Sequence, residues 1–379
     1  MNTDASDAST DPGDVTEEIA RLEVLVRAQT GRSPSTIESI AAGLGTRRFY
    51  RVRFSSGDPA SLIARIEPTA TEAPDPDQPV PPAWLPEPPL EPLRQFLEDA
   101  GLRVPHSIAH LLVEGIDLLE DVGGRTLKDV DEPQRTALYR EACSIVPRLQ
   151  RLSSTTDEIP AFTRVFDHAL IETKAWKWLH WTIPGLLGRP ASDEESTSLH
   201  LVFDTLASLL DAAPRRLAHR DFKAENLHLV CEPAPNASAS AAPTDQIVMI
   251  DVQGAFMAPP EYDLVCLLYD LQVDLDEDFA MDCFHETLPD LPDPVDAEAA
   301  ALRFDAIATV RLCKDISHLV HAGRVRKDTR RWHEIPRGLA LLDRVTGRLT
   351  RTIPEIQTLN SVIHALTLAT GSSDSSRQV

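Results

Sequence analysis

Apolar residues recur at helical spacing near the start of the chain and then at alternating positions. The apolar residues between positions 14 and 30 share one helical face, and Gly31 is a suitable stop for that helix. In residues 48–54 every second position is apolar, and residues 61–66 form a second strand-like run. The turn-forming residues 55–58 between these runs predict an antiparallel hairpin in a small sheet.

Further along, the pattern becomes mainly helical. Helices are predicted over residues 132–152, 162–181 and 196–213, a strand–loop–strand unit over 217–252, and more helices from residue 261 onward. A proline-rich stretch at 68–92 interrupts the first half, because proline removes backbone donors and restricts the chain. The pattern predicts an α+β, two-lobed protein with a small β-rich N-lobe and a large helical C-lobe.

These patterns give an expected domain organisation. Residues 1–13 are expected to be a disordered acidic tail, and residues 14–119 an N-lobe containing the proline-rich loop 68–92. Residues 120–370 are expected to form the C-lobe, and residues 371–379 a second disordered tail.

Composition limits the possible functions. The 379 residues carry a formal charge of −22, which disfavours a nucleic-acid-binding protein because phosphate binding needs a concentrated basic face. No apolar run reaches the roughly 20 residues of a membrane span, and the acidic N-terminus lacks signal-peptide features. The five cysteines show no paired spacing. We therefore expect a cytoplasmic protein without nucleic-acid or membrane partners; its oligomeric state is not predicted.

One segment carries recognisable chemistry. Residues 219–227 read HRDFKAENL, in which Asp221 is followed five residues later by Asn226. This spacing is typical of kinase catalytic loops, where the acid orients or deprotonates the acceptor hydroxyl and the asparagine binds Mg²⁺. Asp251 follows the apolar run 246–250 and is the expected second Mg²⁺ ligand. Lys223 is predicted either to approach the γ-phosphate or to be a solvated cation beside Glu225.

The wider sequence resembles a family of small-molecule kinases. Residues 251–270, DVQGAFMAPPEYDLVCLLYD, are similar to a block of the aminoglycoside phosphotransferase and choline kinase superfamily. Residues 46–52, 96–105, 118–123, 310–316 and 335–339 resemble further segments of its anomeric kinases, which phosphorylate N-acetylmuramate and N-acetylglucosamine during cell-wall recycling. A protein kinase is disfavoured because only six residues separate Asp251 from the APPE segment, which leaves no room for an activation loop.

The resemblance implies ATP and Mg²⁺ as cofactors and a nucleotide site. Gly43, Gly45 and Thr46 match the nucleotide loop, while Leu119 and Asp121 lie in the segment that would meet adenine between the lobes. No lysine precedes Lys128, so the usual phosphate-binding lysine is missing and Arg65 is the expected substitute. Gly254 replaces the second acid of the family's metal-binding block, which weakens the expected metal site.

The sequence thus predicts a kinase that phosphorylates a hydroxyl of a small molecule, an amino sugar of cell-wall recycling being the first choice. Two alternatives stay open at this point. An aminoglycoside or choline-type kinase would take a cationic acceptor. Residues 270–298 favour this alternative, because they contain eleven acids and no Lys or Arg. A non-enzymatic nucleotide-binding scaffold of kinase fold would account for the missing lysine and for Gly254.

Overall fold

The strands expected near the N-terminus form a five-stranded antiparallel sheet in the order β1-β2-β3-β5-β4. The structure, a computed structural model, describes residues 12–40, 47–67, 88–156, 158–232, 244–294 and 296–374. The predicted hairpin is confirmed, because β2 and β3 pair antiparallel with Tyr50 opposite Ala64. The sheet and its helix comprise α1 (Pro12–Thr30), β1 (Thr36–Ile40), β2 (Arg48–Arg53), β3 (Ser61–Ile66), β4 (Ser107–Leu111) and β5 (Ile116–Glu120).

One face of this sheet is covered by α1. Leu22 and Val26 of the helix are fully buried against alternate residues of the central strands, among them Val52, Leu62 and Leu118. Alternation therefore separates an apolar face under α1 from an opposite face that carries Arg65 and its neighbours. Gly31 ends α1 with a φ of +69°, a left-handed conformation that glycine adopts without strain.

The chain divides into two compact units. The first takes in residues 1–73 and 104–123, and the second residues 74–103 and 124–379. Helix α2 (Glu91–Asp99), which the sequence assigned to the N-lobe, groups with the second unit. The segment that follows it is held there by the backbone, since the Met249 N–H donates to the Arg103 carbonyl over 2.9 Å.

The terminal segments also differ from expectation where they are described. Pro12 and Gly13 belong to α1, and residues 371–374 continue the last helix, so neither set belongs to a tail. Pro92 lies in the first turn of α2, a position where a proline costs no hydrogen bond. Residues 1–11, 68–87 and 375–379 lie outside the described residues.

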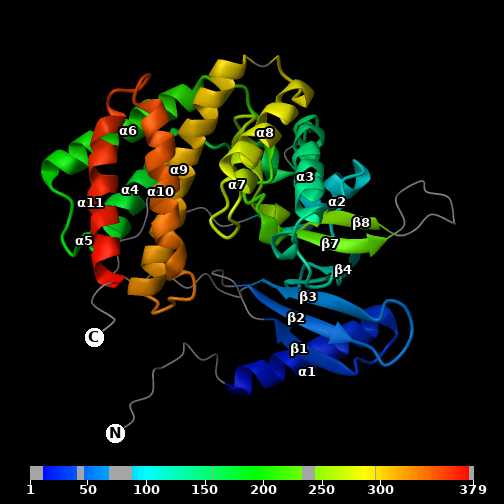
Figure 1. Ribbon diagram of the computed structural model, residues 1–379. Helices are drawn as coiled ribbons and strands as arrows, with labels where there is room; N and C mark the ends of the chain where they lie inside the picture. Colours follow the sequence, from blue (N-terminus) through cyan, green and yellow to red (C-terminus); the bar gives the residue numbers. More distant parts are fainter. Residues whose placement is uncertain are drawn as a thin grey trace, which may run out of the picture. The chain divides into compact units, whose positions relative to one another are not determined.

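The second unit is mainly helical, as predicted, and its long helices α9, α10 and α11 run side by side (Figure 1). Within the described part of the chain, no helix is both long and apolar enough to cross a bilayer. Besides α2, the α-helices described in this unit are α3 (Gln134–Gln150), α4 (His168–Lys177), α5 (Ile183–Leu187), α6 (Asp193–Asp211), α7 (Tyr262–Leu268), α8 (Glu277–Thr287), α9 (Ala297–Arg324), α10 (Ile335–Leu349) and α11 (Ile356–Asp374). A π-helical turn (Trp178–Thr182) joins α4 to α5, and 3-10 turns lie at 127–129, 160–162, 224–226, 252–254, 288–290 and 332–334.

Two short antiparallel pairs interrupt the helices and position the loops between them. Strands β7 (Leu227–Glu232) and β8 (Thr244–Met249) pair with Leu227 opposite Met249. Strands β6 (Arg216–Ala218) and β9 (Phe256–Ala258) pair with Ala218 opposite Phe256. The loops 219–226 and 250–255 therefore leave neighbouring strand ends.

Helix α4 begins later than the sequence predicted. The pattern placed a helix over 162–181, but Phe162 ends a separate 3-10 turn and α4 starts at His168. Asp167 fixes the new start, because its side chain accepts a hydrogen bond of 2.9 Å from the Leu170 N–H.

Close packing of α10 against α9 predicts opposite effects for two glycines of α10. A Cβ at Gly338 would lie 2.9 Å from Ile316 Cγ1 and 3.2 Å from Leu271 Cδ1, whereas a Cβ at Gly347 would meet nothing within 4 Å. Overpacking should make Gly338→Ala less stable by about 1–3 kcal/mol, while Gly347→Ala should gain up to about 1 kcal/mol from helix propensity. Urea denaturation followed by circular dichroism measures both; equal effects would contradict this packing.

Candidate active site

The segment predicted to be catalytic forms the loop between β6 and β7. His219 begins it and is buried, with its Nε2 donating to the Ile250 carbonyl over 2.9 Å. Burial lowers the pKa of His219, so the imidazole is neutral. Its role is to hold the loop by a hydrogen bond and not to contribute a charge. The loop is thereby tied to the strand that leads into Asp251.

The backbone at Arg220 adopts a left-handed conformation with a φ of +82°. Such a conformation costs a non-glycine residue about 1–3 kcal/mol and persists only where its surroundings hold it. Asp263 at the start of α7 supplies one restraint, accepting the N–H groups of His219 and Arg220 over 2.7 and 3.1 Å. Arg311 Nη1 and Cys266 Sγ supply the other, donating to the Arg220 carbonyl over 2.7 and 3.3 Å.

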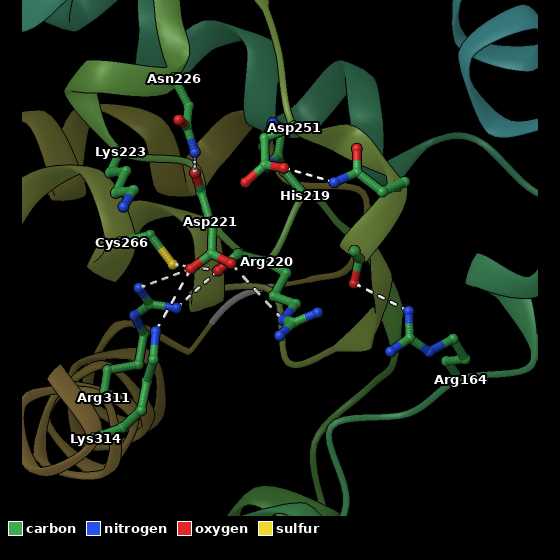
Figure 2. Close-up of polar contacts among 12 residues, drawn as sticks. Arg164, His219, Arg220, Asp221, Lys223, Asn226, Asp251, Cys266, Arg311 and Lys314 are labelled. Carbon is green, nitrogen blue, oxygen red and sulfur yellow. Dashed lines mark hydrogen bonds and ion pairs between the residues drawn. The ribbon is translucent and has the colours of Figure 1, made fainter. Parts of the chain in front are cut away.

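Asp221 is surrounded by basic groups (Figure 2). Arg311 Nη2, Lys314 Nζ and Arg220 Nε lie 3.5, 3.6 and 3.8 Å from its carboxylate oxygens. Burial by itself would raise the pKa of Asp221, but the charges of Lys314, Arg220 and Arg311 outweigh burial and hold the pKa well below its usual range. These pairs are longer than ordinary hydrogen bonds and the side chain is 23% exposed, so an ionised carboxylate can accept from an incoming hydroxyl.

Asn226 and Asp251 lie at the same end of the β7–β8 hairpin, and the Ile250 N–H donates to the Asn226 carbonyl over 3.0 Å. The Asn226 Nδ2 donates to the Asp221 carbonyl over 2.9 Å, which fixes the amide and leaves its oxygen for another partner. Asp251 is exposed, and its Oδ1 accepts from Gln253 Nε2 over 2.6 Å. An amide oxygen and a carboxylate are the hard ligands that Mg²⁺ prefers, so the donor set fits this ion.

Lys223 forms an ion pair with Glu225 over 2.5 Å. Burial would lower its pKa, but the charges of Glu225 and Asp221 raise it. The contact seen is thus the one expected of a cation beside Glu225, and the approach of Lys223 to a γ-phosphate stays a prediction.

The space beside Gly254 is taken by a side chain of the catalytic loop. A Cβ at this position would lie 2.9 Å from Arg220 Nη1, so an acidic side chain here would require the guanidinium to move. An acid at position 254, where the family has its second acid, would occupy the space that the Arg220 side chain fills in this structure.

Arg65, the expected phosphate-binding residue of the first unit, has carboxylate partners of its own. Arg65 is buried and donates to Asp117 over 2.6 Å and to Glu67 over 2.5 Å. Its charge is therefore already matched on the sheet face opposite α1, and its binding of phosphates stays a prediction. Gly43, Gly45 and Thr46 lie outside the described residues.

Asp121 follows β5 and holds three segments of the first unit together. Its carboxylate accepts from Arg51 Nε over 2.8 Å, from Ser61 Oγ over 2.7 Å and from the Gly123 N–H over 3.1 Å. Burial opposes ionisation, yet these bonds lower the pKa of Asp121. Leu119 is buried on β5 beside it; contact of either residue with adenine stays a prediction.

Part of the acidic segment 270–298 is compensated in space, which the sequence did not show. Four of its eleven acids form ion pairs with basic residues of other elements, two cap helices, and Asp270 accepts the Ala224 N–H of the 219–226 loop over 3.1 Å. These roles weaken the argument from this segment for a cationic acceptor. The ion pairs are Asp274–Arg337, Glu277–Arg344, Glu277–Arg348, Glu286–Arg140 and Asp293–Arg216, and the caps are Asp276 for α8 and Asp296 for α9.

Three residues that shape the site had no role in the sequence analysis. Arg311 and Lys314 lie in residues 310–316, and Asp263 lies in residues 251–270, segments quoted only for their resemblance to the family. The resemblance was the one available signal, because nothing in the local pattern of α9 or α7 separates these residues from other charges on helices.

The chain is similar to known phosphotransferases. The model of the phosphotransferase enzyme family matches residues 36–299. An N-acetylmuramate/N-acetylglucosamine kinase of Neisseria meningitidis is 26% identical over 87% of this chain and 92% of its own length. The enzyme of the same name from Pseudomonas putida is 25% identical over 74% and 79%. For that of Pseudomonas aeruginosa, 27% identical, the match spans 48% of this chain and about half of the relative, 51%.

Solved structures show the same fold. Choline kinase LicA from Streptococcus pneumoniae superposes with a TM-score of 0.54 at 14% identity, covering 86% of this chain and 99% of its own. A spectinomycin phosphotransferase in complex with ADP and spectinomycin gives 0.53 at 13% identity, over 92% and 98%. With this fold and a family match over most of its length, the chain belongs to the phosphotransferase enzyme family and is a small-molecule kinase.

Proposed function

We propose that the protein transfers the γ-phosphate of ATP to the anomeric hydroxyl of an amino sugar, N-acetylmuramate or N-acetylglucosamine. The observation that carries the proposal is the ionised, accessible Asp221 carboxylate, fixed beside Asn226 and Asp251. The three curated relatives named for these two sugars support this choice of acceptor.

In the proposed reaction, Asp221 accepts a hydrogen bond from the acceptor hydroxyl and orients its oxygen. A bond forms between this oxygen and the γ-phosphorus, the bond from the γ-phosphorus to the β–γ bridging oxygen breaks, and the hydroxyl proton passes to Asp221. Because its pKa is low, Asp221 takes the proton late and releases it readily. Positioning of the two reactants therefore supplies most of the acceleration.

The remaining groups bind the nucleotide in this proposal. Asn226 and Asp251 would hold Mg²⁺, which when bound neutralises charge on the phosphate oxygens. Arg65, Lys223 and the loop of Gly43, Gly45 and Thr46 would contact phosphates, and Leu119 and Asp121 would meet adenine.

A cationic acceptor is the alternative suggested by the names of the similar solved structures, a choline kinase and a spectinomycin phosphotransferase. Their superposition shows a shared fold, and at identities of 13–14% it carries no argument about the substrate. The ion pairs of four acids in residues 270–298 weaken the observation that favoured this alternative, and basic groups surround Asp221 instead.

Asp221→Asn should separate chemistry from binding. The amide cannot accept the proton, so we expect kcat to fall by about 10²–10⁴-fold while the Kd for ATP stays within a factor of three. ADP release is measured with N-acetylmuramate, N-acetylglucosamine, kanamycin and choline as acceptors. Asp193→Asn, an exposed aspartate at the start of α6, is the matched control.

Three outcomes would count against the proposal. Near-wild-type transfer by Asp221→Asn would remove Asp221 from the reaction. Turnover of kanamycin or choline by the wild type, with neither sugar used, would replace the amino sugar with a cationic acceptor. Nucleotide binding without turnover of any acceptor would favour the scaffold function.

Asp251→Asn tests the metal site. Loss of the negative ligand should raise the Mg²⁺ concentration for half-maximal activity at least tenfold, with a smaller change in the KM for the acceptor. A Mg²⁺ titration of ADP release at saturating ATP measures this. An unchanged Mg²⁺ requirement would show that Asp251 does not bind the ion.

A further inference from the structure

A cluster of basic side chains extends from Asp221 toward α4. Lys314 on α9 belongs to it, and Lys174 and Lys177 on α4 face it across the contact between these two helices. Lys177 Nζ lies 2.8 Å from His318 Nε2, one turn beyond Lys314 on α9. The proposed reaction leaves Lys174, Lys177 and His318 without a role.

Positive charge exceeds negative charge in this region. Apart from Lys223, which pairs with Glu225, five basic groups act on two carboxylates, Asp221 and Asp315; the five are Lys174, Lys177, Arg220, Arg311 and Lys314. Burial lowers the pKa of Lys174 well below its usual value, but the other cations still outnumber the two carboxylates. Asp315 already pairs with Lys314 over 2.9 Å and lies 3.7 Å from Arg311. Among the described residues, no carboxylate forms an ion pair with Lys174 or Lys177. A bound anion would supply the missing charge.

His318 shows how Lys177 is held. Burial, and then the charges of Lys177, Lys314 and Lys174, place the pKa of His318 well below its usual value, so the ring is neutral. Its Nε2 therefore accepts from the Lys177 ammonium and directs it. The centre of the Trp181 ring lies 5.2 Å from Lys177 Nζ and makes a cation–π contact with it.

The cluster lies on the acceptor side of Asp221. Figure 2 shows Asn226 and Asp251 on one side of Asp221, and Arg311 and Lys314 on the other. The metal ligands mark the side from which the nucleotide phosphates approach, so the basic side is left for the acceptor.

We propose that the acceptor carries a negatively charged group, and that Lys177, oriented by His318 and assisted by Lys174, binds this group. The inference rests on the proposed function and selects within it: of the two sugars, N-acetylmuramate has a carboxylate and N-acetylglucosamine has none. The cluster makes the enzyme selective for a sugar acid.

Calorimetry with N-acetylmuramate and its neutral carboxamide, in the presence of a non-hydrolysable ATP analogue, tests this directly. The wild type should bind the acid at least tenfold more tightly than the amide. Lys177→Met should reduce the ratio to about two, and Lys177→Arg, which keeps the charge, should retain most of it. Lys128→Met, at an exposed lysine on the 127–129 turn, is the matched control.

The binding ratio tests the inference and turnover tests the proposed function, so either can fail without the other. A wild-type ratio near one, no binding of either compound, or a ratio unchanged in Lys177→Met would overturn the inference even if both sugars are phosphorylated. Weaker ATP binding by Lys177→Met with the ratio preserved would assign the cluster to the nucleotide and also overturn it. Selective binding of the acid without turnover would sustain the inference while the proposed function fails.

The selectivity should also depend on pH. Burial lowers the pKa of Lys177 to about 8, assisted by the charges of Lys314 and Arg220 and opposed by Asp315. Besides these groups, Lys174 and His318 face it. Lys177 is cationic below its pKa, so the ratio of kcat/KM for N-acetylmuramate to that for N-acetylglucosamine should fall as pH rises through about 8. A ratio constant from pH 6 to 9.5 would contradict the role of Lys177.

Discussion

The left-handed peptide at Arg220 is the constraint on which the rest of the site depends. Asp263 accepts the two N–H groups before it, and Arg311 and Cys266 donate to the carbonyl after it. With both sides of the strained residue bonded, the backbone that leads into Asp221 is fixed. The same Arg311 also faces the Asp221 carboxylate at 3.5 Å, so one guanidinium fixes the backbone and favours the charge.

Two aspartates of this site show how environment assigns different tasks to one residue type. Burial raises the pKa of Asp263, and its bonds to His219 and Arg220 only partly offset this effect. Its role is to accept hydrogen bonds from the backbone N–H groups of these two residues. Asp221 meets three cations at longer range, which lower its pKa and leave its oxygens open to a substrate. The basic groups around Asp221 continue toward Lys174 and Lys177, where the proposed anionic acceptor would bind.

Local pattern was enough to predict the elements that carry chemistry. Alternation gave the β2–β3 hairpin, and the apolar run before Asp251 gave β8, because both depend on neighbours in sequence. The start of α4 was missed, since one capping bond from Asp167 decided it. Two partners of Asp221, Arg311 and Lys314, lie some ninety residues away on α9, and the ion-pair partners of the acidic segment lie on other elements. These contacts exist only in the folded chain. Arg65 was predicted from the missing lysine, but its pairing with Asp117 could not be read from spacing.

The atom that receives the phosphate is the most direct test of the account. N-acetylmuramate labelled with ¹³C at its anomeric carbon would be incubated with the protein, ATP and Mg²⁺, and the product examined by ¹³C and ³¹P nuclear magnetic resonance. The account predicts a new phosphate ester whose phosphorus couples to the labelled carbon. A phosphate on another hydroxyl would contradict the placement of the acceptor beside Asp221, and no sugar phosphate at all would contradict the proposed reaction.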